Sequence, residues 1–134
     1  MVANVISLLL VITVIVVIYY WLDFFCRKGV QVIQEEWYIK FQKAFPIADT
    51  WMVICALFAI IGLLTEQEFG LFFTILAASS MIFLALMDIT FNFENKMYHL
   101  LKTSNEMKIE LAGNIWLLFV GITVILFVWT RMII

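Results

Sequence analysis

The residues of this chain best suited to chemistry are polar side chains at the end of a long apolar stretch. Asp88 follows the uncharged stretch 69–87, and further along come Asn92, Asn95 and His99 at steps of four, three and four. If the helix continues past Asp88, these side chains share one face. A charged group near hydrocarbon costs about 2.5–3.5 kcal/mol on insertion scales, so it usually faces a bundle interior and marks a functional site. We therefore place Asp88, Asn92 and Asn95 in a candidate ligand-binding site.

Three more polar residues lie where other apolar stretches begin. Asp49 precedes the stretch 51–64, and Glu110 and Asn114 are four residues apart at the start of the last stretch. In an antiparallel bundle with short connections, these helix ends would meet Asp88. Carboxylates would supply negative charge, and amides would complete the hydrogen bonding without adding more. The pattern predicts one inner-leaflet acidic pocket for a small cation, an amine or a lipid headgroup.

Each of these residues also has a purely structural interpretation. Asp49 and Glu110 lie where a carboxylate can cap a helix N-terminus and interact with its dipole. Asn114 can hydrogen-bond another helix inside the membrane. Asp88 lies at a helix C-terminus, where the dipole disfavours an anion. It therefore needs a proton, a ligand or a cationic partner, and a nearby lysine could be that partner.

Four apolar stretches must position these side chains. Residues 2–22, 51–64, 69–87 and 111–130 contain no Lys, Arg, Asp or Glu, in a chain that is 66% hydrophobic and 13% charged. A bilayer core about 30 Å thick needs roughly 20 helical residues, so the second helix should reach back past Asp49. We predict an all-α integral membrane four-helix bundle that forms one domain over residues 1–134. Its spans are expected at about 2–22, 48–65, 69–88 and 111–131.

The connection between the first two spans has the pattern of a further helix, over about residues 28–45. Apolar residues recur there at steps of three and four, the period of one helical face: Val30, Ile33, Trp37, Phe41 and Phe45. Pro46 should end this helix, because proline cannot continue it. We predict an amphipathic helix lying at the cytoplasmic membrane interface. The alternative is that its apolar face packs on the bundle.

The basic residues indicate how the bundle is oriented. Four of the eight lie in the first long connection, three lie in the connection 88–110, and only Arg131 lies on the opposite side, at the end of the last span. By the positive-inside rule, both long connections are cytoplasmic and both termini are outside. The expected location is a plasma membrane, such as a bacterial inner membrane.

Several classes of protein are disfavoured by what the sequence lacks. A formal charge of −2 without a basic stripe gives no reason to expect a nucleic-acid partner. Cys26 and Cys55 form no metal-binding or redox motif. The sequence contains no P-loop, nucleophile elbow or zinc-protease motif. No cofactor is indicated.

Three hypotheses about function remain. The first is binding or transport of a small cation, an amine or a lipid headgroup by Asp88, Asn92, Asp49, Asn114, Glu110 and Asn95. The second is a structural or regulatory subunit of a larger membrane complex, or a homo-oligomer, in which Asp88 pairs with a partner's Arg or Lys. The third is a small lipid-modifying enzyme in which Asp88 and Asp49 act as acid and base.

Overall fold

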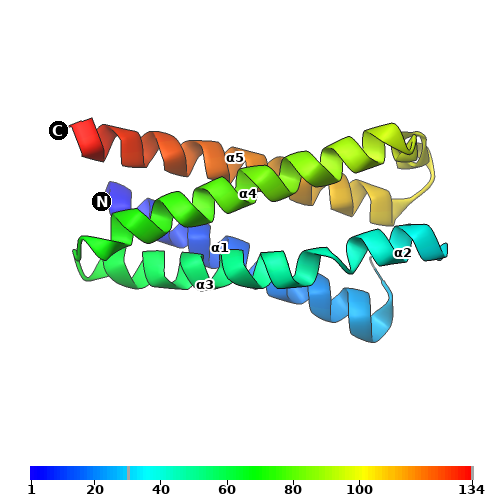
Figure 1. The fold of residues 1–134 in the computed structure, drawn as a ribbon, viewed down its shortest axis with the longest axis horizontal. Coiled ribbons are helices and arrows are strands. Elements are labelled where there is room, and N and C mark those ends of the chain that lie inside the picture. The colour runs from blue at the N-terminus through cyan, green and yellow to red at the C-terminus, as the bar shows by residue number, and fades with distance from the viewer. Residues whose placement is uncertain (30, 134) are drawn as a thin grey trace.

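The computed structural model describes residues 1–29 and 31–133, and within these ranges all regular structure is helical (Figure 1). The first span, α1, is continued by a π-helical turn, and a 3-10 helix precedes the last span. The elements in chain order are α1 (Val2–Leu22), the π-helical turn (Asp23–Arg27), α2 (Glu36–Gln42), α3 (Phe45–Leu64), α4 (Phe69–Glu94), the 3-10 helix (Met97–Lys102) and α5 (Asn105–Ile133).

Four helices are long and apolar enough to cross a membrane, which confirms the predicted all-α class and the number of spans. They cover Val2–Arg27, Glu36–Leu64, Phe69–Glu94 and Asn105–Met132. The helices extend past the apolar stretches, because a helix continues into polar residues until a turn ends it. In particular, α3 begins at Phe45 and so reaches back past Asp49, as predicted.

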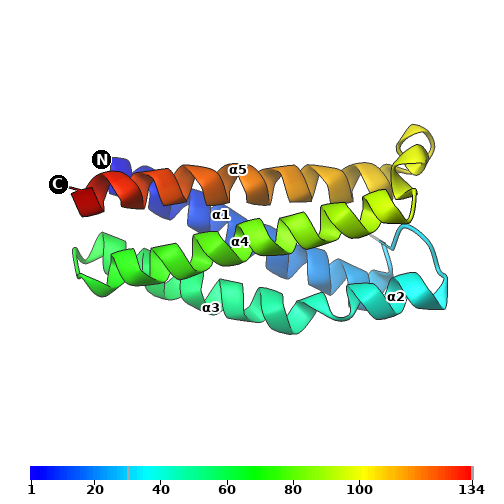
Figure 2. The same ribbon diagram turned by 45° about the horizontal axis from the view of Figure 1, so that its top comes forward.

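The long helices run antiparallel. The N-terminus, the C-terminal end of α5 and the short turn between α3 and α4 lie at one end of the bundle, which we call the terminus end (Figures 1 and 2). Both long connections lie at the opposite end, which we call the connection end. Contacts are extensive between α3 and α4 and between α4 and α5, and α1 packs mainly on α3. The contact between α1 and α5 is much smaller.

The helix predicted over residues 28–45 is wrong in its bounds. Lys28 ends the π-helical turn in a left-handed conformation (φ 56°), and residues 31–35 are not helical. Val30 lies outside the described residues. Only Glu36–Gln42 forms α2, and a turn at Lys43 separates it from α3. Pro46 lies in the first turn of α3, where a backbone N–H would have no partner within the helix, so the missing N–H of proline costs nothing there. Pro46 therefore begins α3 rather than ending α2.

The short α2 packs on the bundle through two kinds of side chain. The ring of Phe41 stacks on Phe91 of α4 with centroids 3.6 Å apart, and Trp37 lies beside the same ring. Tyr38 and Gln42 are both buried, although the expected apolar face did not include them. For these residues, the alternative in which the segment packs on the bundle describes the structure. Tyr38 and Gln42 lead directly into the polar cluster below α2.

Candidate functional site

Three carboxyl groups from three different helices border one internal cavity near the connection end. Asp49 comes from α3, Asp88 from α4 and Glu110 from α5, and each is more than nine-tenths buried. The cavity has a volume of about 90 Å³, several times the space that one water molecule needs. The antiparallel packing therefore brings together the acidic residues that the sequence placed at separate helix ends.

Asp88 is held by two neutral amides. Asn114 Nδ2 donates a hydrogen bond to Asp88 Oδ2 at 2.8 Å, and Gln42 Nε2 donates to Asp88 Oδ1 at 3.3 Å. The amides come from α5 and α2, so this carboxyl group joins three helices. No described lysine or arginine pairs with it, and the structural interpretation in which Asp88 forms an ion pair within the chain is therefore not found.

Glu110 is held in the same way by two neutral donors. Asn92 Nδ2 donates to Glu110 Oε1 at 2.8 Å, and the Tyr38 hydroxyl donates to Glu110 Oε2 at 2.8 Å. Glu110 and Asp88 line the same cavity. Two ionised carboxylates side by side repel each other, so this pair needs a proton or a bound cation.

Asp49 has a single partner. Trp21 Nε1 of α1 donates to Asp49 Oδ2 at 2.6 Å, and no other described side chain donates to this carboxyl group. Asp49 is the fifth residue of α3, so it does not cap the helix as the structural interpretation supposed. Its second oxygen is left for whatever occupies the cavity, since Asp49 lines the cavity wall.

The positive charges of the described residues lie elsewhere. The ion pairs among the described residues are Arg27–Asp23, at 4.0 Å, and Lys40–Glu36, at 2.8 Å. Each involves a strongly exposed basic side chain. The three buried acids are thus hydrogen-bonded only to amide, phenol and indole groups. Charge balance inside the bundle has to come from protons or from a ligand.

The remaining cavity wall includes several aromatic side chains. Among the described residues, no group of three His, Cys, Asp or Glu side chains is placed to hold a metal. Four aromatic side chains line the cavity together with the acids: Tyr20, Trp21, Phe45 and Trp116. Aromatic faces attract ammonium groups through their quadrupole. Carboxylates combined with aromatic rings are therefore suited to an ammonium ligand.

Most of the predicted site residues come together, with one exception. Asp49, Asp88, Glu110 and Asn114 line the cavity, and Asn92 adjoins it through its hydrogen bond to Glu110. Asn95 is exposed and donates only to the Phe91 carbonyl oxygen of its own helix, because α4 ends at Glu94.

The end of α4 also separates Asn92 from His99, two residues that were expected on one helix face. Lys96 adopts a left-handed conformation (φ 55°) directly after α4, and this turns the chain into the 3-10 helix that carries His99. Tyr98 belongs to the same 3-10 helix. The Tyr98 hydroxyl and Asn92 Oδ1 are both buried without a hydrogen bond to another described group. The predicted polar face thus ends at Asn92.

Sequence reasoning identified Asn92 and Asn114 as site residues but missed the other donors that hold the acids. Tyr38 and Gln42 are four residues apart, so they share one face of α2, and that spacing was a signal for a polar face turned toward the bundle. The indole N–H of Trp21 donates to Asp49, a role that was not predicted from the sequence. The hydroxyl of Tyr20 has no sequence signature that separates it from other interfacial tyrosines.

Comparison of the chain with protein-family models, with curated proteins and with solved structures finds no match. The candidate site is therefore assigned on its own geometry.

Proposed function

We propose that this protein binds a small organic ammonium group in the cavity between Asp49, Asp88 and Glu110. The observation that carries the proposal is the set of three buried carboxyl groups, hydrogen-bonded only to neutral donors, around a cavity large enough for a ligand. Burial of ionised carboxylates is costly unless a proton or a positive charge compensates it. A bound cation supplies that charge where the chain does not.

The aromatic wall supports an ammonium ligand in particular. An ammonium donates hydrogen bonds to carboxylates, while its carbon substituents contact rings such as Trp21 and Trp116. Toward the terminus end, the core is filled by buried side chains such as Leu10, Met81 and Val124. A ligand is therefore held at one end of the bundle, and its transport across the membrane would need a change in helix packing.

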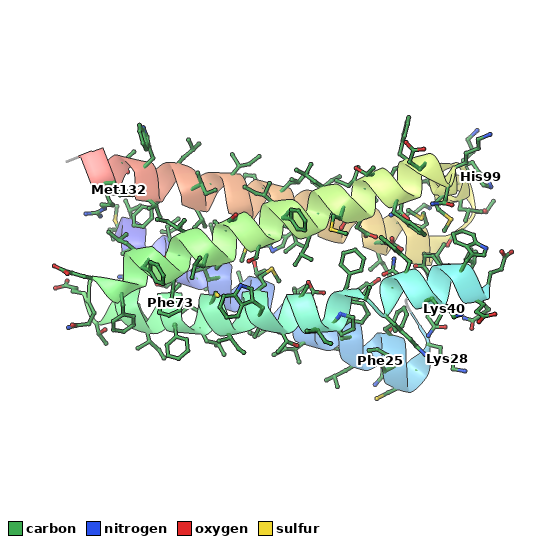
Figure 3. All side chains as sticks on the ribbon, in the orientation of Figure 1. Phe25, Lys28, Lys40, Phe73, His99 and Met132 are labelled. Carbon is green, nitrogen blue, oxygen red and sulfur yellow. The ribbon has the colours of Figure 1, made fainter. Side chains whose placement is uncertain are left out.

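The proposal includes a placement in the membrane. We propose that the connection end faces the cytoplasm of a plasma membrane, such as a bacterial inner membrane, and that α2 lies at its interface. Lys28, Lys40 and His99 lie at this end, whereas Met132 lies at the other (Figure 3). Basic side chains concentrate on the cytoplasmic side of membrane proteins. The cavity then opens at the level of the inner leaflet.

The subunit hypothesis receives less support from the site. Asp88 is only 7% exposed and already accepts hydrogen bonds from Gln42 and Asn114. A partner's Arg or Lys would have to enter the bundle to reach it.

The test is calorimetric titration of the purified protein, in a mild nonionic detergent, with butylammonium chloride. Asp88→Asn and Glu110→Gln should each weaken binding about tenfold or more, since 1.4 kcal/mol corresponds to a factor of ten. Both variants can keep their fold, because a neighbouring side-chain amide or hydroxyl can reorient to match the new amide. Glu36→Gln, which changes an exposed acid of α2, is the control and should bind as the wild type does. Unchanged binding in Asp88→Asn, or no binding by the wild type, would contradict the proposal.

A further inference from the structure

We infer that the ligand is a lipid-borne amine, an ammonium group on a long hydrocarbon chain, which enters sideways from the bilayer between α1 and α5. This inference rests on the proposed function and names its class of ligand. It depends on where the cavity is open, where it is closed and how much of a ligand it can hold.

The cavity opens between α1 and α5. Of the side chains that line it, only Val16 of α1 and Ile109 of α5 are exposed on the outer surface, at 47% and 51%. All its other lining residues are buried or half-buried. Side chains that line a cavity and also face outward mark its mouth. Both are apolar, so the mouth is suited to contact with hydrocarbon.

Gly113 leaves the mouth wide. It lines the cavity between Ile109 and Trp116 on α5, and a Cβ atom added to it would meet nothing within 4 Å. The mouth is limited toward the membrane centre, where Trp116 Nε1 donates to Thr13 Oγ1 at 2.9 Å and joins α5 to α1. The opening therefore lies about one turn, roughly 5.4 Å, nearer to the connection end than this hydrogen bond.

The side facing the connections is closed by α2. Tyr38 is fully buried and Gln42 is 3% exposed. Their hydrogen bonds to Glu110 and Asp88 hold α2 over the two carboxyl groups. A ligand arriving from water would have to break both bonds, whereas one arriving from the bilayer meets only apolar side chains at the mouth.

The size of the cavity indicates that the ammonium group lies inside it and the hydrocarbon chain outside. About 90 Å³ accommodates an ammonium group with a few carbons and not a long chain. Asp49 and Tyr20 line the cavity. The second carboxylate oxygen of Asp49 has no described partner and can receive the ammonium. A long chain has to leave through the mouth at Gly113, where it lies among lipid chains.

The experiment compares a short and a long amine in phosphatidylcholine nanodiscs, with native mass spectrometry as the readout. Gly113→Leu and Val16→Trp narrow the mouth from its two sides. Each should lower retention of dodecylammonium about tenfold more than it lowers retention of butylammonium. Ala112→Leu, at an exposed position next to Gly113, is the matched control and should retain both amines.

A shallow groove between α1 and α3 also reaches Asp49 and supplies the rival route. Thr50 lies in its wall, so Thr50→Leu narrows this groove and leaves the α1–α5 mouth unchanged. If Thr50→Leu rather than the mouth variants releases dodecylammonium, or if neither mouth variant discriminates between the amines, lateral entry between α1 and α5 is overturned. If the wild type retains neither amine, the proposed function itself fails.

Discussion

The glycines at the two ends of the bundle have opposite surroundings. Near the terminus end, a Cβ atom on Gly62 would lie 2.3 Å from the Cα atom of Gly70, so α3 and α4 touch through their backbones. Near the connection end, a Cβ atom on Gly113 would meet nothing. Small residues in membrane helices commonly permit close packing. Gly113 shows that the same residue type can instead leave a gap.

The difference follows the distribution of polar groups. The terminus end is filled by small apolar residues such as Ala59 and Ala77, which need no partner beyond close contact. The connection end holds three acids whose donors lie on different helices, so the helices there are spaced by hydrogen bonds between side chains. The cavity there is lined by residues of α1 and α5, the pair of long helices whose mutual contact is much smaller than that of the other contacting pairs. Close packing thus characterises the terminus end, whereas the connection end contains a cavity.

The largest effect should come from adding a methyl group at the tight end. Gly62→Ala forces α3 away from α4, because the new atom would overlap backbone rather than a flexible side chain. Overpacking of this kind costs about 1–3 kcal/mol, and we expect the upper part of that range. The measurement is unfolding by sodium dodecyl sulfate, followed by circular dichroism. Gly113→Ala is the matched variant and should change the free energy of unfolding by less than about 0.5 kcal/mol. Equal losses in the two variants would refute the comparison between the ends.

The next largest effect should come from α2, which covers the cavity at the connection end. Tyr38→Phe removes the hydroxyl that donates to Glu110 Oε2 and leaves a buried acceptor without its donor. A loss of about 2 kcal/mol is expected, and amide hydrogen exchange should accelerate over α2. Tyr19→Phe changes an exposed tyrosine and should leave stability and exchange unaltered. Unchanged exchange over α2 in Tyr38→Phe would show that α2 is held on the bundle by Phe41 and Trp37 alone.

The sequence predicted the parts of this fold that follow from hydropathy and from the thickness of a bilayer. The four spans follow from the absence of charge over long stretches, and the reach of α3 past Asp49 follows from the thickness of a bilayer. That Asp88, Asn92 and Glu110 would converge followed from antiparallel packing. These inferences use only hydropathy and helix geometry, which are local properties of the chain.

The remaining features depend on contacts between distant segments. The period of apolar residues after position 28 matched a helix, but the left-handed residue Lys28 and the start of α3 at Phe45 confine α2 to seven residues. Asn95, which directly follows the last residue of α4, is exposed, and no periodicity in the sequence indicates which positions near a helix end are covered by other segments. The width of the gap at Gly113 depends on how α1 and α5 are spaced, which no local pattern encodes.

An intermediate case sharpens the comparison between the glycines. A Cβ atom on Gly121 would lie 2.7 Å from Ile82 Cγ1 and 3.1 Å from the Ala78 carbonyl oxygen. The isoleucine side chain can shift, while the backbone oxygen yields only slightly. Gly121→Ala should therefore cost about 1 kcal/mol, between the values for Gly62 and Gly113, in the same unfolding assay. Gly121→Ala combined with Ile82→Val should regain part of the loss, and no recovery would show that the backbone contact dominates.

The smallest effect should come from the hydrogen bond that limits the mouth. Thr13→Val keeps the shape of the side chain and removes the acceptor of Trp116 Nε1. Hydrogen bonds between membrane helices contribute about 0.6 kcal/mol on average, so the loss of stability should be small. The loosened indole should instead change the fluorescence of Trp116, measured in a variant that keeps it as the only tryptophan. Ser80→Ala removes a hydroxyl bonded within its own helix and should leave that fluorescence unchanged.

The hydrogen bond between Trp116 and Thr13 separates the mouth from the packed core. Thr13→Val should therefore also let α1 and α5 move further apart, so that the protein retains amines with bulkier chains. Retention of only the original amines would show that the packed core, rather than this hydrogen bond, limits the mouth.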